Sequence, residues 1–73
     1  MVTQEMIQLI EAYGWLSIPS KNPFMISFTD EEDTERMNVY FTTGTITIQS
    51  NDKPIKTWKG IQNITQLETI LML

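Results

Sequence analysis

The side chains best suited to binding another molecule are aromatic, amide, hydroxyl and lysine side chains in the second half of the chain. They alternate with apolar residues from Met37 to Gln49 and recur around Trp58. Aromatic rings can stack on nucleobases at about 1–3 kcal/mol per base, amides and hydroxyls can hydrogen-bond base edges, and lysines can neutralise phosphates. The pattern predicts a nucleic-acid-binding set of Asn38, Tyr40, Thr42, Thr47, Gln49, Lys53, Lys56, Trp58 and Lys59.

Catalytic chemistry has little support within these 73 residues. The sequence contains no histidine and no cysteine, which excludes imidazole proton transfer, cysteine nucleophiles and thiolate metal sites. Five of the nine acidic residues fall within Asp30–Glu35, a stretch without apolar residues that is typical of a solvated loop. A catalytic carboxylate pair needs a fixed separation, which such a loop does not provide. We therefore expect a non-catalytic protein with no cofactor and no metal.

Charge is unevenly distributed along the chain. The formal net charge is −4, yet three of the five basic residues lie within Lys53–Lys59. Charges act locally, over a Debye length of about 10 Å, so the acidic and basic segments can serve as separate surfaces. The overall acidity favours an alternative function, a protein-interaction module (an adaptor, subunit or inhibitor) that uses a sheet face, a sheet edge or the acidic loop.

Two amphipathic helices are predicted to flank the segments that carry these residues. Apolar residues recur at helical spacing in residues 3–13, with Thr3 as a candidate N-cap and Gly14 as the stop signal. The same spacing predicts a second helix over residues 63–73, where Asn63 and Gln66 form a capping box.

Four or five strands are predicted between the helices. Alternation predicts strands over residues 15–18, 24–28, 37–42, 45–49 and 54–58, with Thr43-Gly44 as a two-residue hairpin turn. The order predicts a single α+β domain spanning residues 1–73, in which an antiparallel sheet carries both helices on one face. The predicted core face consists of Phe24, Ile26, Phe28, Met37, Val39, Phe41, Ile46, Ile48 and Ile55.

The opposite face of the sheet is predicted to be open. It is expected to hold Ser27, Asn38, Tyr40, Thr42, Thr45, Thr47, Gln49, Lys56 and Trp58. A binding surface has this composition, but antiparallel sheets also leave one face to solvent, and threonine favours strands for packing reasons. Composition leaves both interpretations open.

The segments Pro23–Phe28 and Met37–Ser50 together resemble the N-terminal substrate-binding domain of type 3 ribonuclease H. The family pattern is a strand, a Ser/Thr-Gly turn and a second alternating strand followed by glutamine. Thr43-Gly44 and Gln49 match the turn and the glutamine in this sequence. The resemblance covers about half of the chain. It implies a fold like half of TATA-box-binding protein and a sheet face that binds nucleic acid. In that family a basic residue follows the turn glycine and a glycine follows the glutamine, where this sequence has Thr45 and Ser50.

Location and assembly are predicted from the ends of the sequence. No apolar run approaches the roughly 20 residues that span a bilayer, and no secretory signal is evident. We expect an intracellular protein, cytoplasmic or nuclear, that has no membrane partner and is not secreted. Met72 and Leu73 are not needed for the apolar stripe of the last helix, which predicts a weak homodimer.

Overall fold

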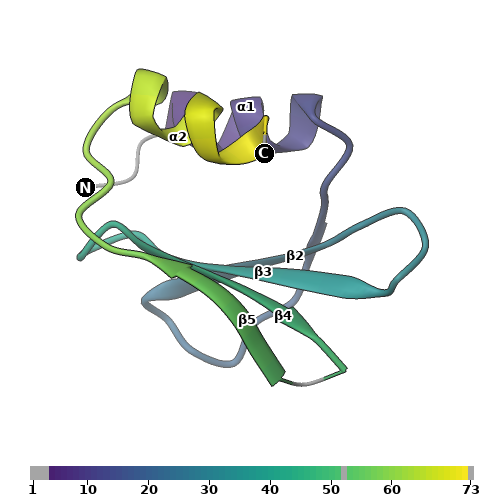
Figure 1. The fold of residues 1–73 in the computed structure, drawn as a ribbon. Helices are drawn as coiled ribbons and strands as arrows, with labels where there is room; N and C mark the ends of the chain where they lie inside the picture. The colour runs from purple at the N-terminus through teal and green to yellow at the C-terminus, as the bar shows by residue number, and fades with distance from the viewer. Residues whose placement is uncertain (1–3, 52, 73) are drawn as a thin grey trace.

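Five antiparallel strands form one sheet in chain order, and two helices cover one of its faces (Figure 1). The computed structural model describes residues 4–51 and 53–72. The elements are α1 (Gln4–Ala12), β1 (Leu16–Ile18), β2 (Met25–Thr29), β3 (Glu35–Tyr40), β4 (Thr45–Ser50), β5 (Lys53–Trp58) and α2 (Ile64–Leu71). The predicted α+β arrangement is confirmed. β1 and β5 form the two edges of the sheet.

The ends of the helices follow local sequence signals. Helix α1 stops before Gly14, whose φ of +95° suits a residue without a Cβ. The side chain of Asn63 caps α2 by accepting a hydrogen bond of 2.9 Å from the backbone N–H of Gln66. The Gln66 side-chain oxygen in turn accepts a hydrogen bond from the backbone N–H of Gln62. In a standard capping box the donor is the N–H of the cap residue, which here is Asn63. The predicted cap Thr3 lies outside the described residues.

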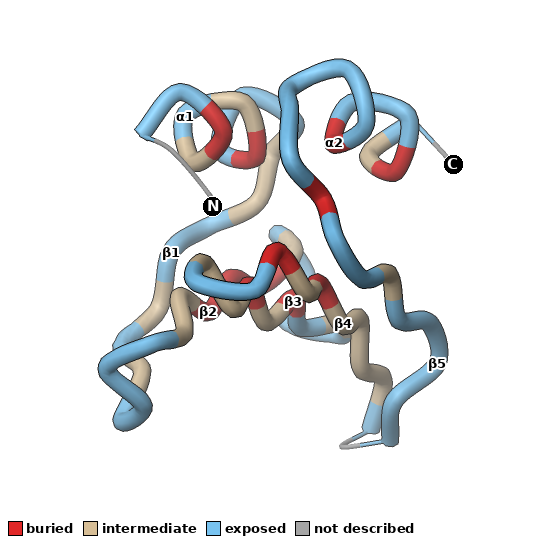
Figure 2. Tube along the Cα trace, turned by 90° about the vertical axis from the view of Figure 1, so that its left-hand side faces the viewer, coloured by how far each residue is buried: buried red, intermediate tan, exposed pale blue. Residues whose placement is uncertain are grey.

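The core lies between the two helices and the centre of the sheet. Figure 2 shows buried residues on the facing sides of these layers, whereas β5 is exposed along most of its length. The buried apolar residues are Met6, Ile10, Phe28, Met37, Val39, Ile46, Ile61, Leu67 and Ile70. Ile26, Phe41 and Ile48 are partly buried against this core, as predicted.

Two residues of the predicted core face are exposed. Phe24 is 58% exposed because β2 begins only at Met25, which leaves Phe24 in the preceding turn. Ile55 is 50% exposed because it lies on the edge strand β5, at an irregularity in the pairing with β4. Placing these two side chains in the core was wrong.

The turn between β3 and β4 is longer than predicted. Tyr40 pairs with Thr45, so the turn spans residues 41–44, and the N–H of Gly44 donates to the carbonyl of Tyr40 at 2.9 Å. Gly44 has a φ of +71°, and its carbonyl accepts a 3.0 Å hydrogen bond from the N–H of Ile61. A Cβ on Gly44 would come within 2.9 Å of the Ile61 nitrogen and closer still to its carbonyl oxygen. This close approach ties the turn to the segment that leads into α2.

The acidic stretch forms the turn between β2 and β3, and Glu35 belongs to β3. The Asp30 carboxylate accepts hydrogen bonds from the backbone N–H of Thr34, at 2.7 Å, and from the Thr34 hydroxyl. These bonds, the hydroxyl bond first, hold the pKa of Asp30 below its ordinary value. The Thr29 hydroxyl donates to the Asp33 carboxylate at 2.9 Å. Two of the five acids therefore close the turn.

Candidate interaction surfaces

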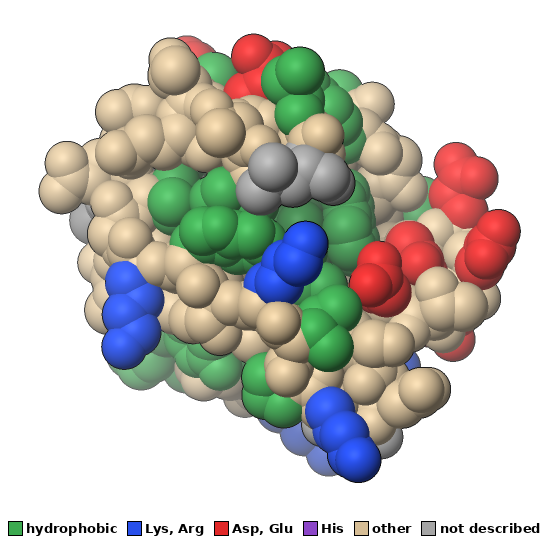
Figure 3. All heavy atoms as spheres, viewed as in Figure 1, with side chains coloured by type: hydrophobic (Ala, Val, Ile, Leu, Met, Phe, Trp, Pro, Cys, Tyr) green, Lys and Arg blue, Asp and Glu red, His purple; other side chains and the backbone are tan. Residues whose placement is uncertain are grey.

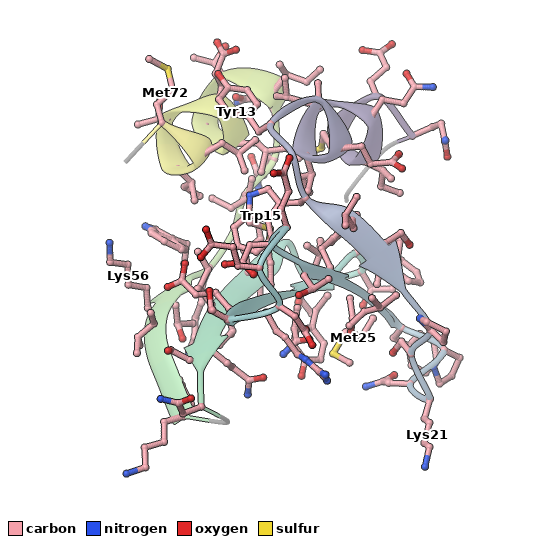
Figure 4. All side chains as sticks on the ribbon, turned by 90° about the vertical axis from the view of Figure 1, so that its right-hand side faces the viewer. Tyr13, Trp15, Lys21, Met25, Lys56 and Met72 are labelled. Carbon is pink, nitrogen blue, oxygen red and sulfur yellow. The ribbon has the colours of Figure 1, made fainter. Side chains whose placement is uncertain are left out.

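Cross-strand pairing assigns four of the predicted binding residues to the open face. Residues paired across neighbouring strands project from the same face of a sheet. Asn38 pairs with Thr47, while Tyr40 and Gln49 lie on the same face of β3 and β4. The pairing also places on this face residues that the sequence analysis did not assign to it, among them Arg36 opposite Gln49, Thr57 opposite Thr47 and Met25 opposite Tyr40. Figure 4 shows Met25 on the side of the sheet away from the helices.

Placing Lys56 and Trp58 on the open face was wrong. Trp58 pairs with the fully buried Ile46, and Lys56 pairs with Ile48 on the helix side. The physical reason is a shift in register between β4 and β5. Ile48 pairs with Lys56, but the next residue of β4, Gln49, pairs with Pro54, so Ile55 has no partner on β4. Such a β-bulge reverses the alternation beyond it. Trp58 consequently packs against the core.

The remaining predicted binding residues lie at the ends of strands. Thr42 is exposed in the β3–β4 turn. Lys53 begins β5 opposite Ser50, and Lys59 follows the last residue of β5. The structure therefore divides the predicted set between two faces and the rim of the sheet, and whether these residues bind nucleic acid stays a prediction.

The polar side chains of the open face hydrogen-bond to one another. The Ser27 hydroxyl donates to the Asn38 side-chain oxygen, and the Asn38 amide nitrogen donates to the Gln49 side-chain oxygen, both at 3.0 Å. The Thr47 and Thr57 hydroxyls lie 3.5 Å apart. These contacts link β2 to β3, β3 to β4 and β4 to β5. Much of the hydrogen-bonding capacity predicted for a ligand is thus used within the sheet.

A cavity of about 130 Å³ opens on the other side, between β5 and α2. We call it the β5 groove, and its lining residues are Trp15, Glu35, Met37, Ile48, Ile55, Lys56, Ile70 and Leu71. Figure 3 shows apolar side chains in the space between α2 and β5 with lysine beside them. Figure 4 places Trp15 and Lys56 on the helix side of the sheet. The strand that borders the groove, β5, is an edge of the sheet that the described residues form.

The lysines near the groove form no ion pair among the described residues. Lys53, Lys56 and Lys59 are exposed, and among the described residues none of them has an acidic partner within ion-pair distance. Figure 3 shows basic side chains along β5 and acidic ones at the β2–β3 turn. The predicted separation of acidic and basic segments holds for the β2–β3 turn but not for Glu35, which lines the groove together with Lys56.

Trp15 also lines a second, shallower depression of about 250 Å³, together with Tyr13, Gly14, Asp30 and Glu31. The Tyr13 hydroxyl donates to the Glu68 carboxylate at 3.3 Å, which joins the two helices. Burial and the nearby negative charge of Glu68 raise the pKa of Tyr13 above its ordinary value. The sequence analysis assigned Trp15 only to a strand, and no motif around it signals its position between the two depressions.

Comparison with protein-family models, with curated proteins and with solved structures found no match to this chain. The resemblance to the type 3 ribonuclease H domain therefore stays a prediction.

Neither α1 nor α2 is long and apolar enough to cross a membrane. Met72 is 70% exposed, while Leu73 lies outside the described residues, so the predicted homodimer also stays a prediction.

Proposed function

We propose that this protein is a non-catalytic protein-interaction module that docks its partner in the β5 groove. The observation that carries the proposal is an open cavity with six apolar lining residues beside an exposed sheet edge. Native cores leave few voids, because apolar contacts are lost wherever a side chain has no neighbour. A partner side chain placed in the groove restores those contacts.

The composition of the groove resembles that of protein interfaces. Their centres are apolar and rich in aromatic and methionine side chains, with charged groups at the rim. Trp15, Met37 and Ile48 line the groove, and Ile55 presents half of its surface to solvent. The groove carries one charge of each sign, since Lys56 and Glu35 are both among its lining residues.

Site-specific crosslinking tests this proposal directly. Because the chain contains no cysteine, a single cysteine at position 55 or 57 can carry a photoactivatable crosslinker. Ile55 borders the groove, whereas Thr57 lies two residues along the same strand on the open face. In the cells that make the protein, we expect Ile55→Cys to capture one protein and Thr57→Cys to capture none. Capture of that protein by Thr57→Cys alone would place the interface on the open face and contradict the proposal.

Nucleic-acid binding through the open face is the second candidate function. It is supported by the position of α1 and α2 on the other face of the sheet and by Tyr40 and Arg36, an aromatic ring and a guanidinium that can stack on bases and contact phosphates. If this face binds single-stranded, duplex or hybrid oligonucleotides, Tyr40→Ala should weaken binding by about 1–3 kcal/mol. Unchanged oligonucleotide affinity in folded Tyr40→Ala and Arg36→Ala would exclude this function.

A further inference from the structure

We propose that the partner presents an acidic segment with a single large apolar side chain, which enters the β5 groove while neighbouring carboxylates pair with the β5 lysines. This inference rests on the proposed docking function and specifies the chemistry of the partner.

The volume of the groove sets the size of the apolar group. A cavity of about 130 Å³ is close to the roughly 150 Å³ cavity in another protein that holds one benzene molecule. One leucine or phenylalanine side chain fills such a space. The accessible walls that would contact it are Ile48, Ile55 and Leu71, which belong to three different elements. The partner segment therefore needs one large apolar residue at the groove and polar residues on either side.

The lysines of β5 set the charge of the partner segment. Lys56 lines the groove itself, and Lys53 and Lys59 lie three residues before and after it. Lys53 and Lys56 both belong to β5 and lie about 10 Å apart at about 3.3 Å per residue, while Lys59 follows the end of the strand, and none of the three has an acidic partner among the described residues. Complementary charge across an interface selects the partner and speeds encounter. An extended segment that matches these lysines carries carboxylates about three residues to either side of its apolar residue.

The same features disfavour a second copy of this chain as the occupant. Two β5 edges brought together would oppose their lysines. The acidic turn of another copy would supply charge, but residues 30–35 contain no apolar residue to fill the groove. Pro54 and the bulge also discourage the addition of a strand to β5. Recognition therefore proceeds through side chains, and the partner is a different protein.

Immobilised peptide arrays test this proposal with defined probes. One set of 12-residue peptides carries a central leucine or phenylalanine flanked by aspartate and glutamate. A second set replaces every acid with lysine, and a third keeps the acids but replaces the apolar residue with serine. We expect only the first set to bind the full chain. Binding should change the fluorescence of Trp15 and the methyl chemical shifts of Ile48 and Ile55.

Charge reversal at the groove supplies the decisive variant. Lys56→Glu should weaken binding of the acidic set about tenfold, or about 1.4 kcal/mol, because it places like charges opposite one another. The same change should permit binding of the lysine set. Lys21→Glu makes the same change in net charge in the β1–β2 loop, far from the groove in Figure 4, and should change neither affinity. Glu35→Gln should leave the acidic preference intact.

The outcomes separate this inference from the proposed function. If the lysine set binds wild-type protein at the groove, docking stands and the acidic partner is wrong. If peptides lacking the apolar residue bind equally well, the single-residue insertion is wrong. If no set shifts groove residues and oligonucleotides shift the open face, the inference and the docking function both fail.

Discussion

The two faces of the sheet near β5 differ in how far their side chains are already engaged. On the open face, Ser27, Asn38 and Gln49 bind one another across three strands. On the helix side, Lys56 borders a cavity and has no acidic partner among the described residues. The open face has the composition of a binding surface but uses much of it for cohesion of the sheet. For this reason we place the proposed docking site at the β5 groove and not on the open face.

The largest expected effect is a loss of stability, and it should differ between the two phenylalanines at the ends of the predicted strand over residues 24–28. Phe28 is fully buried on the helix side, whereas Phe24 is 58% exposed. Phe28→Ala should lower the free energy of unfolding by about 3–5 kcal/mol, and Phe24→Ala by about 1 kcal/mol or less. Urea unfolding followed by circular dichroism measures both. Equal losses would mean that both side chains are buried and that β2 begins earlier than described.

Two glycines give the next largest contrast. Gly44 and Gly60 share a φ of +71°, but only Gly44 has backbone of Ile61 against the position of a Cβ. Gly60→Ala should cost about 1–2 kcal/mol for the left-handed conformation. Gly44→Ala should cost about 2–5 kcal/mol, because displacement of packed backbone adds about 1–3 kcal/mol. The same unfolding assay measures the difference, and similar losses would show that the contact with Ile61 is dispensable.

Alternation predicted the layers and most of the core correctly because β2, β3 and β4 pair regularly. It failed at Lys56 and Trp58 because a bulge depends on pairing with β4, which the sequence of β5 does not reveal. Ile61 was missed because the connector before α2 has no periodicity. The groove was also beyond prediction, since Trp15, Glu35 and Ile70 are far apart in sequence and meet only in the fold.

A third substitution pair sharpens the comparison between the faces. Asn38→Ala removes two side-chain hydrogen bonds of the open face and should lower stability by about 1–2 kcal/mol without affecting partner capture at the groove. Lys56→Ala should leave stability within about 0.5 kcal/mol and weaken capture. Unfolding and the Ile55→Cys crosslinking assay are the two readouts. Loss of capture in stable Asn38→Ala protein would transfer the interface to the open face.

The smallest expected effect is a dependence on acidic pH at the β2–β3 turn. The pKa of Asp30 is lowered in the fold, so its ionised form is favoured there. Its contribution to stability is therefore complete above the ordinary value of 3.8 and is lost as pH falls through that value toward the lowered pKa. In Thr34→Val, which lacks the hydroxyl bond, NMR titration should find the pKa of Asp30 closer to 3.8. An unchanged pKa would mean that this hydroxyl does not hold the turn.

The most direct test of the account is a titration of the free protein with toluene, followed by methyl NMR. An open apolar groove should bind the ring saturably, with shifts concentrated in the methyl groups of Ile48, Ile55 and Ile70. The Met25 methyl on the opposite face is the internal reference and should not move. Shifts at Met25 comparable with those at the three isoleucines, or no saturable shift at the isoleucines, would contradict the claim that the helix side of β5 is the docking surface.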